Sequence, residues 1–214
     1  MSSANPIVAA AAGTGQPSDA AHLRAWAQWA AQASPGENRE LAVKLMKRCL
    51  AGKSDVLMLP YLGLRSLPAL LPPCSVLQIS GNALQALPVT LPDGLKRLSL
   101  YCEPELRQLP ATLPDLNSLK VLSTGVCSLP RTLPATLREV DIQDNPLASL
   151  PDLLPPLEVA FFNRNRFTAM PASVFSLPAS CNVYFYDNLL THEVQQQVRQ
   201  TLCAPDYCGP DVRL

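Results

Sequence analysis

The sequence is poor in the groups on which most enzymes and nucleic-acid-binding proteins depend. Only 16% of its 214 residues are charged, 17 basic residues balance 17 acidic ones, and no basic stripe appears. This balance argues against nucleic acid as the main partner. The only histidines, His22 and His192, fall in predicted helices, where we expect both to be solvated. No phosphate loop, nucleophile elbow or zinc-helix motif occurs, so we expect no catalytic residue, metal site or cofactor.

Long apolar runs are also missing. None approaches the roughly 18 residues that suggest a membrane span. The N-terminus lacks the positively charged segment and apolar core of a standard secretory signal. The seven cysteines are an odd number without a paired framework, which favours a reducing compartment. Cys74 takes a leucine position and is expected in the core. Cys203 and Cys208 are close in sequence, but no second pair or histidine cluster makes them a zinc site.

The chain does contain one repeating stretch, between Leu57 and Leu190. Its best copy begins at Leu77 and reads Leu-Gln-Ile-Ser-Gly-Asn-Ala-Leu. The frame starts again every 20 to 23 residues, from the anchors Leu57, Leu77, Leu98, Leu119, Val140, Ala160 and Val183. A period near 20 with this pattern is typical of a leucine-rich-repeat solenoid. We therefore predict a horseshoe of the α/β class, with a parallel β-sheet on its concave face.

Each copy predicts the same local structure. The anchor and the residue two positions later are apolar, which indicates a strand with one buried face. The fifth residue after the anchor is often an asparagine, whose amide can bond the turn backbone: Asn82, Asn145, Asn165 and Asn188. In the other copies this position holds Leu62, Glu103 and Thr124. Leu-Pro pairs follow in each copy. Because proline excludes a regular helix, we expect an extended, Pro-rich convex face.

The third copy carries one extra residue before Leu106. The insertion predicts a bulge or a displaced turn near Glu103–Glu105. Whether this loop has a function or reflects simple repeat drift stays open.

Segments without the repeat flank the array. We divide the chain into a disordered N-terminal segment (1–17), an N-terminal helical cap (18–52), about seven leucine-rich repeats (53–190) and a C-terminal cap and junction (191–214). The first is rich in Ser, Ala and Gly and shows no period. An array with a bare end would expose strand edges and leucines, which is why caps are expected.

Helical periodicity appears in both caps. An α-hairpin is predicted from Ser18 to Ala33 and from about Glu37 to Ala51, with both tryptophans in its core rather than at a ligand site. At the other end an amphipathic helix begins after Thr191. We expect the tail from Ala204 onward to be irregular.

The concave face is the surface on which solenoids bind partners. Large apolar and aromatic residues cluster in the C-terminal half of this face, with charged residues around them, a composition typical of an interface. The candidate partner-binding residues are Arg97, Tyr101, Lys120, Leu122, Asp141, Gln143, Phe161, Asn163, Arg164, Tyr184 and Tyr186. The alternative is that the aromatic residues stack across strands only to stabilise the sheet.

Three stretches carry a more specific signal. These are Leu23-Arg-Ala-Trp26-Ala-Gln-Trp29 with the following Pro35-Gly-Glu-Asn-Arg-Glu-Leu-Ala42, the repeated Leu-Pro-x-x-Leu-Pro, and Ala204-Pro-Asp-Tyr-Cys-Gly-Pro210. In this order they resemble the LPX-repeat bacterial effectors of the IpaH/SspH/SlrP type. The resemblance covers roughly residues 19 to 214.

In that family the repeat domain precedes a helical ubiquitin-ligase domain whose nucleophilic cysteine lies in a Cys-x-Asp motif. The resemblance implies type III secretion into the host cytoplasm or nucleus and recognition of a host substrate by the repeats. It also implies autoinhibitory contact between the repeats and the chain's own C-terminal ligase domain. No cysteine here is followed by x-Asp, so no catalytic residue is carried over, and this chain as given is not expected to be an enzyme.

Three hypotheses follow. The first is the substrate-recognition module of an effector ubiquitin ligase. The second is a non-catalytic adaptor effector, similar to YopM, which gathers host proteins on its concave face. The third is a bacterial structural or adhesion repeat protein. The missing signal peptide and the unpaired cysteines argue against this third hypothesis.

Overall fold

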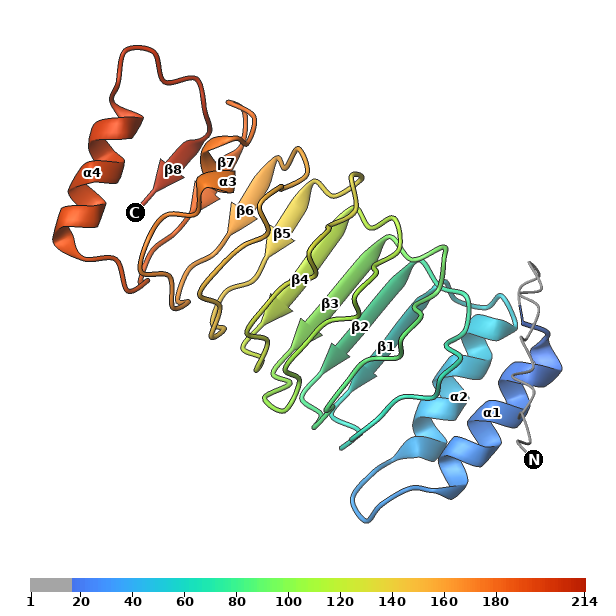
Figure 1. The fold of residues 1–214 in the computed structure, drawn as a ribbon. Coiled ribbons are helices and arrows are strands. Elements are labelled where there is room, and N and C mark those ends of the chain that lie inside the picture. The colour runs from blue at the N-terminus through green and yellow to red at the C-terminus, as the bar shows by residue number, and fades with distance from the viewer. Residues whose placement is uncertain (1–16) are drawn as a thin grey trace, which may run out of the picture.

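The repeats stack into one elongated sheet, with helices at both ends (Figure 1). The computed structural model describes residues 17–214, so the predicted disorder of 1–17 lies outside the described residues, apart from Pro17. The strands are β1 (Val56–Pro60), β2 (Val76–Ser80), β3 (Arg97–Tyr101), β4 (Ser118–Leu122), β5 (Glu139–Asp141), β6 (Val159–Phe161), β7 (Asn182–Tyr184) and β8 (Asp211–Arg213). They pair in parallel and in chain order. The predicted solenoid is confirmed.

The anchors align across the sheet. Leu57 pairs with Leu77, Leu77 with Leu98 and Leu98 with Leu119, and the register continues to Val183. All the anchor side chains are buried in one continuous apolar interior. Burial of one such leucine contributes roughly 1.5–3 kcal/mol, against about 1 kcal/mol for a typical internal hydrogen bond. The apolar stack therefore dominates the stability of the array.

The return segments between β1 and β6 are extended, as predicted, but the last one is not. A single turn of helix, α3 (Ala172–Phe175), precedes β7. In the other return segments two residues separate the first proline from the next Leu-Pro pair, whereas here five residues, 172–176, lie between Pro171 and Leu177. A stretch of that length without proline can close a helical turn, which corrects the expectation of a helix-free convex face.

Two antiparallel helices cover the first repeat: α1 (Asp19–Ala31) and α2 (Arg39–Leu50). The side chain of Ser18 caps α1, and α2 packs against α1 and β1. Trp26 is fully buried, and its indole N–H donates to the Leu70 carbonyl at 2.7 Å. Trp29 is also buried, so both tryptophans belong to the core of the cap.

A buried ion pair ties this cap to the first repeat. The side chains of Arg39 and Glu37 are 7% and 0% exposed, and their closest charged atoms are 2.9 Å apart. Arg39 also donates to the Trp29 carbonyl at 2.6 Å and lies over the Trp29 ring. Glu37 accepts from the Arg65 N–H at 2.8 Å, and Arg39 donates to the Ser66 hydroxyl at 3.3 Å. We call these five residues the cap clamp.

The C-terminal end departs from the predicted irregular tail. The helix α4 (His192–Leu202) begins as expected after its cap Thr191. The chain then returns to the sheet and adds β8, in which Val212 pairs with Val183 and is buried. The Phe185 N–H donates to the Arg213 carbonyl at 2.8 Å. The prediction of an irregular tail was wrong over Asp211–Arg213. The free edge of β7 pairs with another strand there, although β8 follows β7 at a spacing far outside the repeat period.

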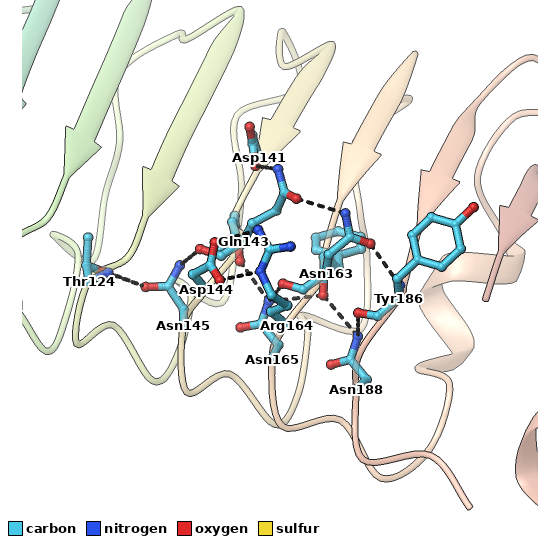
Figure 2. Close-up of polar contacts among 12 residues, drawn as sticks. Thr124, Asp141, Gln143, Asp144, Asn145, Asn163, Arg164, Asn165, Tyr186 and Asn188 are labelled. Carbon is cyan, nitrogen blue, oxygen red and sulfur yellow. Dashed lines mark hydrogen bonds and ion pairs between the residues drawn. The ribbon is translucent and has the colours of Figure 1, made fainter. Parts of the chain in front are cut away.

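Four asparagines join the turns that contain them to the preceding repeat. Asn145 accepts from the backbone N–H of Thr124 at 3.0 Å and donates to the carbonyls of Val121 and Gln143 at 2.6 and 2.8 Å (Figure 2). Comparable bonds to the preceding repeat are made by Asn82, Asn165 and Asn188. We call this set the asparagine ladder. Its amides pair backbone groups that would otherwise be buried without a partner.

Glu103 takes over the acceptor role of an asparagine in the third repeat. It is fully buried, and its two oxygens accept from the N–H groups of Asn82 and Leu84 at 2.9 and 3.1 Å. Burial raises the pKa of Glu103, and these hydrogen bonds only partly offset that effect. The extra residue of this repeat is absorbed by a turn at Pro104–Glu105, which leaves Leu106 buried and confirms the predicted displaced turn.

The raised pKa of Glu103 predicts a pH-dependent stability. Between its ordinary pKa of about 4.5 and the higher folded-state pKa, the folded protein binds more protons than the unfolded chain. The contribution of Glu103 to the free energy of unfolding is therefore fully present below pH 4.5 and is lost as the pH rises through the folded-state pKa of Glu103. The free energy of unfolding of the natural protein, relative to Glu103→Gln, should fall across this window. Urea unfolding of both proteins from about pH 4 to about pH 8 measures it, and a constant difference would contradict the expectation.

Candidate partner-binding surface

The alternate residues of β4 to β8 form one row across the exposed face of the sheet. Parallel pairing places Lys120, Asp141, Phe161, Tyr184 and Arg213 side by side in this order. The rings of Phe161 and Tyr184 stack with centroids 4.7 Å apart, and the Arg213 guanidinium lies 5.1 Å from the centre of the Tyr184 ring. We call these five residues the concave row.

A chain of side-chain amides holds the surface together where the strands shorten. Gln143 donates to Asp141 at 2.9 Å and accepts from the amide of Asn163 at 2.8 Å (Figure 2). Asn163 in turn accepts from the backbone N–H of Tyr186 at 2.8 Å. These bonds fix the backbone beneath Tyr186, whose side chain stays 40% exposed. Asn163 itself is buried and holds the backbone of Tyr186 from beneath the surface.

The charges of the row are partly neutralised by neighbours. Lys120 and Glu139 form an ion pair at 2.7 Å, and the Ser118 hydroxyl donates to Glu139 at 2.8 Å. The hydrogen bond to Glu139 raises the pKa of Lys120. Partial burial acts to raise the pKa of Glu139, but the bonds from Lys120 and Ser118 outweigh it and lower that pKa. Burial raises the pKa of Asp141 despite the bond from Gln143.

The remaining candidates lie around this row. Tyr101 and Leu122 pair at the ends of β3 and β4 and are half-buried, whereas Arg97 is exposed at the start of β3. Arg164 lies outside the sheet face, in the turn after β6, where its φ is 51°. It forms a two-bond ion pair with Asp144 at the edge of the sheet. The bond from Arg164 lowers the pKa of Asp144.

The chain is similar to known bacterial effector proteins. A family model described as a type III secretion system leucine rich repeat protein matches residues 1–44. A solved Shigella effector leucine-rich-repeat domain superposes with a TM-score of 0.64 and 32% identity, over 92% of this chain and 97% of that one. The chain belongs to the leucine-rich-repeat domains of type III effectors.

Curated relatives of this effector domain are longer than the chain. The E3 ubiquitin-protein ligase ipaH9.8 of Shigella boydii is 40% identical over 89% of the chain, which spans 39% of that protein. The E3 ubiquitin-protein ligase ipaH3 of Shigella flexneri is 50% identical over 68 residues, or 12% of its length. The structure of YopM from Yersinia enterocolitica superposes with a TM-score of 0.70 and 36% identity, over 81% of the chain and 38% of YopM.

Sequence reasoning missed two parts of the effector domain's exposed sheet face. Arg213 joins the concave row only because β8 extends the sheet, and the signal for it was a valine between two charged residues, Asp211 and Arg213. At the opposite end, Val56 and Met58 of β1 and the neighbouring Tyr61 are 38%, 46% and 78% exposed. An apolar residue at every alternate position of β1 was the signal for this second patch.

The histidines of the effector domain have separate environments. His22 is buried, and its two ring nitrogens lie 3.1 Å from the Ser18 carbonyl and 3.2 Å from the Leu71 carbonyl. The expectation of a solvated residue was wrong for His22, because the cap folds over the first repeat and covers that side chain. His192 is exposed. Within residues 17–214, no group of three His, Cys, Asp or Glu side chains could hold a metal ion.

All seven cysteines of the effector domain are free thiols. Cys74 is buried, as its position in the repeat predicted, and burial raises its pKa to about 12. A thiol with so high a pKa is a poor nucleophile, which fits a packing role. None of the helices in residues 17–214 is long and apolar enough to cross a membrane.

Proposed function

We propose that the concave row and Tyr186 bind a host protein, and that this domain selects the substrate of an effector ubiquitin ligase delivered by type III secretion. The observation that carries the proposal is an aromatic group on the concave face, in which Phe161 and Tyr184 are half-buried and Tyr186 is exposed, with ionic side chains at both ends of the row. Aromatic and arginine side chains dominate the binding energy of protein interfaces. The bond from Asn163 fixes the backbone at Tyr186, and Phe161 and Tyr184 restrain one another by stacking, so less conformational entropy is lost on binding.

The ligase part of the proposal comes from the relatives. Both ipaH9.8 and ipaH3 are named as E3 ubiquitin-protein ligases, and this chain aligns with part of each. No Cys-x-Asp motif lies in the chain, so the nucleophile would belong to another domain of the parent protein. We further propose that the repeats contact that ligase domain in an autoinhibited state, and that the effector acts in the host cytoplasm or nucleus.

Replacing Phe161 and Tyr186 with alanine tests the binding surface. The natural domain should capture a host protein from host-cell lysate. The double variant should capture at most about one thirtieth of that amount, because an interface hot spot contributes about 2 kcal/mol or more. The free energy of unfolding should change by less than about 3 kcal/mol, because the two ring pairs that Tyr184 forms are lost, at about 0.5–1.5 kcal/mol each. Quantitative mass spectrometry of the captured protein, with urea unfolding alongside, measures both effects.

Val89→Ala is the matched control. Val89 is 84% exposed in a return segment, away from the sheet face, so its truncation removes apolar surface without touching the row. Its capture of the host protein should equal that of the natural domain. If the double variant lost stability and capture together, the aromatic residues would serve the sheet alone, as the stacking alternative states.

A non-catalytic adaptor is the second candidate, favoured by the superposition on YopM. The two functions differ in one assay on the full gene product. With ubiquitin, activating enzyme and a host conjugating enzyme, a ligase forms ubiquitin chains without further help. Chain formation supports the ligase, whereas capture of the host protein without chain formation supports the adaptor. None of the relatives described above is a structural or adhesion protein, the third hypothesis.

A further inference from the structure

A hollow opens at the edge of the sheet, among the turns that follow β3, β4, β5 and β6. Its volume is about 420 Å³, and its lining includes Arg107, Thr124, Gly125, Asp144 and Arg166. Thr124, Asp144 and the neighbouring Asn145 are visible at this edge, beyond the ends of the strands (Figure 2). We call it the rim hollow. It is separate from the concave row, which lies on the face of the sheet.

Two arginines line the rim hollow without forming an ion pair. The one carboxylate in the lining, Asp144, already has both oxygens bonded to Arg164, which lies just outside. Across residues 17–214, no carboxylate lies within ion-pair distance of Arg107 or Arg166, and neither guanidinium makes a hydrogen bond. Both residues are exposed, so their donors are available to a ligand.

Glycine shapes the floor of the rim hollow. A Cβ atom at Gly125 would lie 2.5 Å from the Pro104 carbonyl oxygen and 3.0 Å from a terminal nitrogen of Arg107. Only a residue without a side chain lets the turn of the third repeat close over this position. The Arg107 guanidinium therefore lies directly against bare backbone, which limits the conformations open to it.

We propose that the rim hollow binds a phosphoryl group, with Arg107 and Arg166 as its donors. A phosphoryl monoester carries a charge of about −1.5 to −2 at neutral pH, which matches two unpaired guanidinium groups. Planar guanidinium donors form paired bonds to phosphoryl oxygens. A carboxylate carries a single charge and would leave one arginine without a counter-charge. The source we assign is a phosphorylated side chain of the bound protein. Only that source rests on the proposed function.

Titration with inorganic phosphate tests the site without any host protein. The probes are the backbone amide of Gly125 and the side-chain Nε–Hε groups of Arg107 and Arg166, followed by NMR at constant ionic strength. The natural domain should show saturable shifts at all three. Arg107→Gln and Arg166→Gln should each weaken binding about tenfold or more, because a hydrogen bond to a charged group contributes about 1.5–3 kcal/mol. Acetate at the same ionic strength should bind more weakly than phosphate.

The control is Arg131→Gln, which removes an exposed arginine from a return segment outside the rim hollow. It should bind phosphate as the natural domain does. An equal loss in all three variants, or shifts that never saturate, would show general charge screening and overturn the proposal. Equal binding of acetate would overturn the assignment to a phosphoryl group. Because no host protein enters this assay, its failure leaves the test of Phe161 and Tyr186 untouched.

Discussion

Arg39→Ala should lower the free energy of unfolding by about 3–5 kcal/mol, because it removes one partner of a buried ion pair. The change leaves the buried Glu37 carboxylate without its cation and the Trp29 carbonyl without its 2.6 Å donor. It also removes the guanidinium that lies over the Trp29 ring. The N-terminal cap should unfold before the repeats do, because the cap clamp joins α2 and the loop before it to the first repeat. Urea unfolding followed by tryptophan fluorescence reports on it, since both tryptophans lie in this cap.

Two further variants decide whether the guanidinium itself is responsible. Arg39→Lys keeps the charge but cannot bond Glu37, Trp29 and Ser66 together, so most of the loss should remain. Arg48→Ala removes an exposed arginine from the same helix and should change stability by no more than about 0.5 kcal/mol. If Arg39→Ala cost less than about 1 kcal/mol, the pair would behave as a surface ion pair, and the cap would depend on its apolar contacts alone.

Asn145→Ala should cost about 3 kcal/mol or more in the free energy of unfolding. The substitution leaves the Thr124 N–H and the Val121 carbonyl without their side-chain partner inside the array. Each buried polar group left unpaired costs about 1–3 kcal/mol. Urea unfolding measures the loss, and amide hydrogen exchange should show faster exchange at Thr124 and its neighbours than in the rest of the sheet.

Asn117→Ala gives the matched control, because Asn117 is exposed and lies outside the ladder. Its truncation should change stability by no more than about 0.5 kcal/mol. Asn145→Asp retains the acceptor but places a carboxylate oxygen against two carbonyls, so it should also destabilise. If Asn145→Asp were as stable as the natural protein, the donated bonds would be dispensable and only the accepting oxygen would matter.

Periodic parts of the fold could be predicted from the sequence because each position has one local environment. The anchor position, which Leu98 occupies in the third copy, is buried in every copy. The spacing of the anchors is therefore enough to predict the strands, their buried face and their register. The helices of the cap follow from apolar periodicity and from capping residues such as Ser18 and Thr191. Glu103 was noticed only as an exception. Its chemistry required the structure, because the groups it bonds lie in the preceding repeat.

The parts that were missed depend on contacts between distant segments. His22 is buried because a carbonyl 49 residues away packs against its ring. The strand β8 forms because β7 offers a free edge, a property of the assembled sheet and not of residues 211–213. For the candidate surface, the columns of the repeat identified the aromatic residues, but Asn163 could not be recognised as a positioning residue. Its bonds to Gln143 and Tyr186 cross three repeats.

The direction of the asparagine ladder has a consequence for synthesis and unfolding. Asn82, Asn145, Asn165 and Asn188 all reach back to the repeat before them. A coil that has just left the ribosome therefore keeps unpaired amides and carbonyls until its successor emerges and docks. Loss of a ladder coil from the C-terminal end frees backbone groups of the turn before it, whereas loss of a coil from the N-terminal end frees the side-chain amide of the asparagine after it. The array is therefore directional: its two ends expose different polar groups as it shortens.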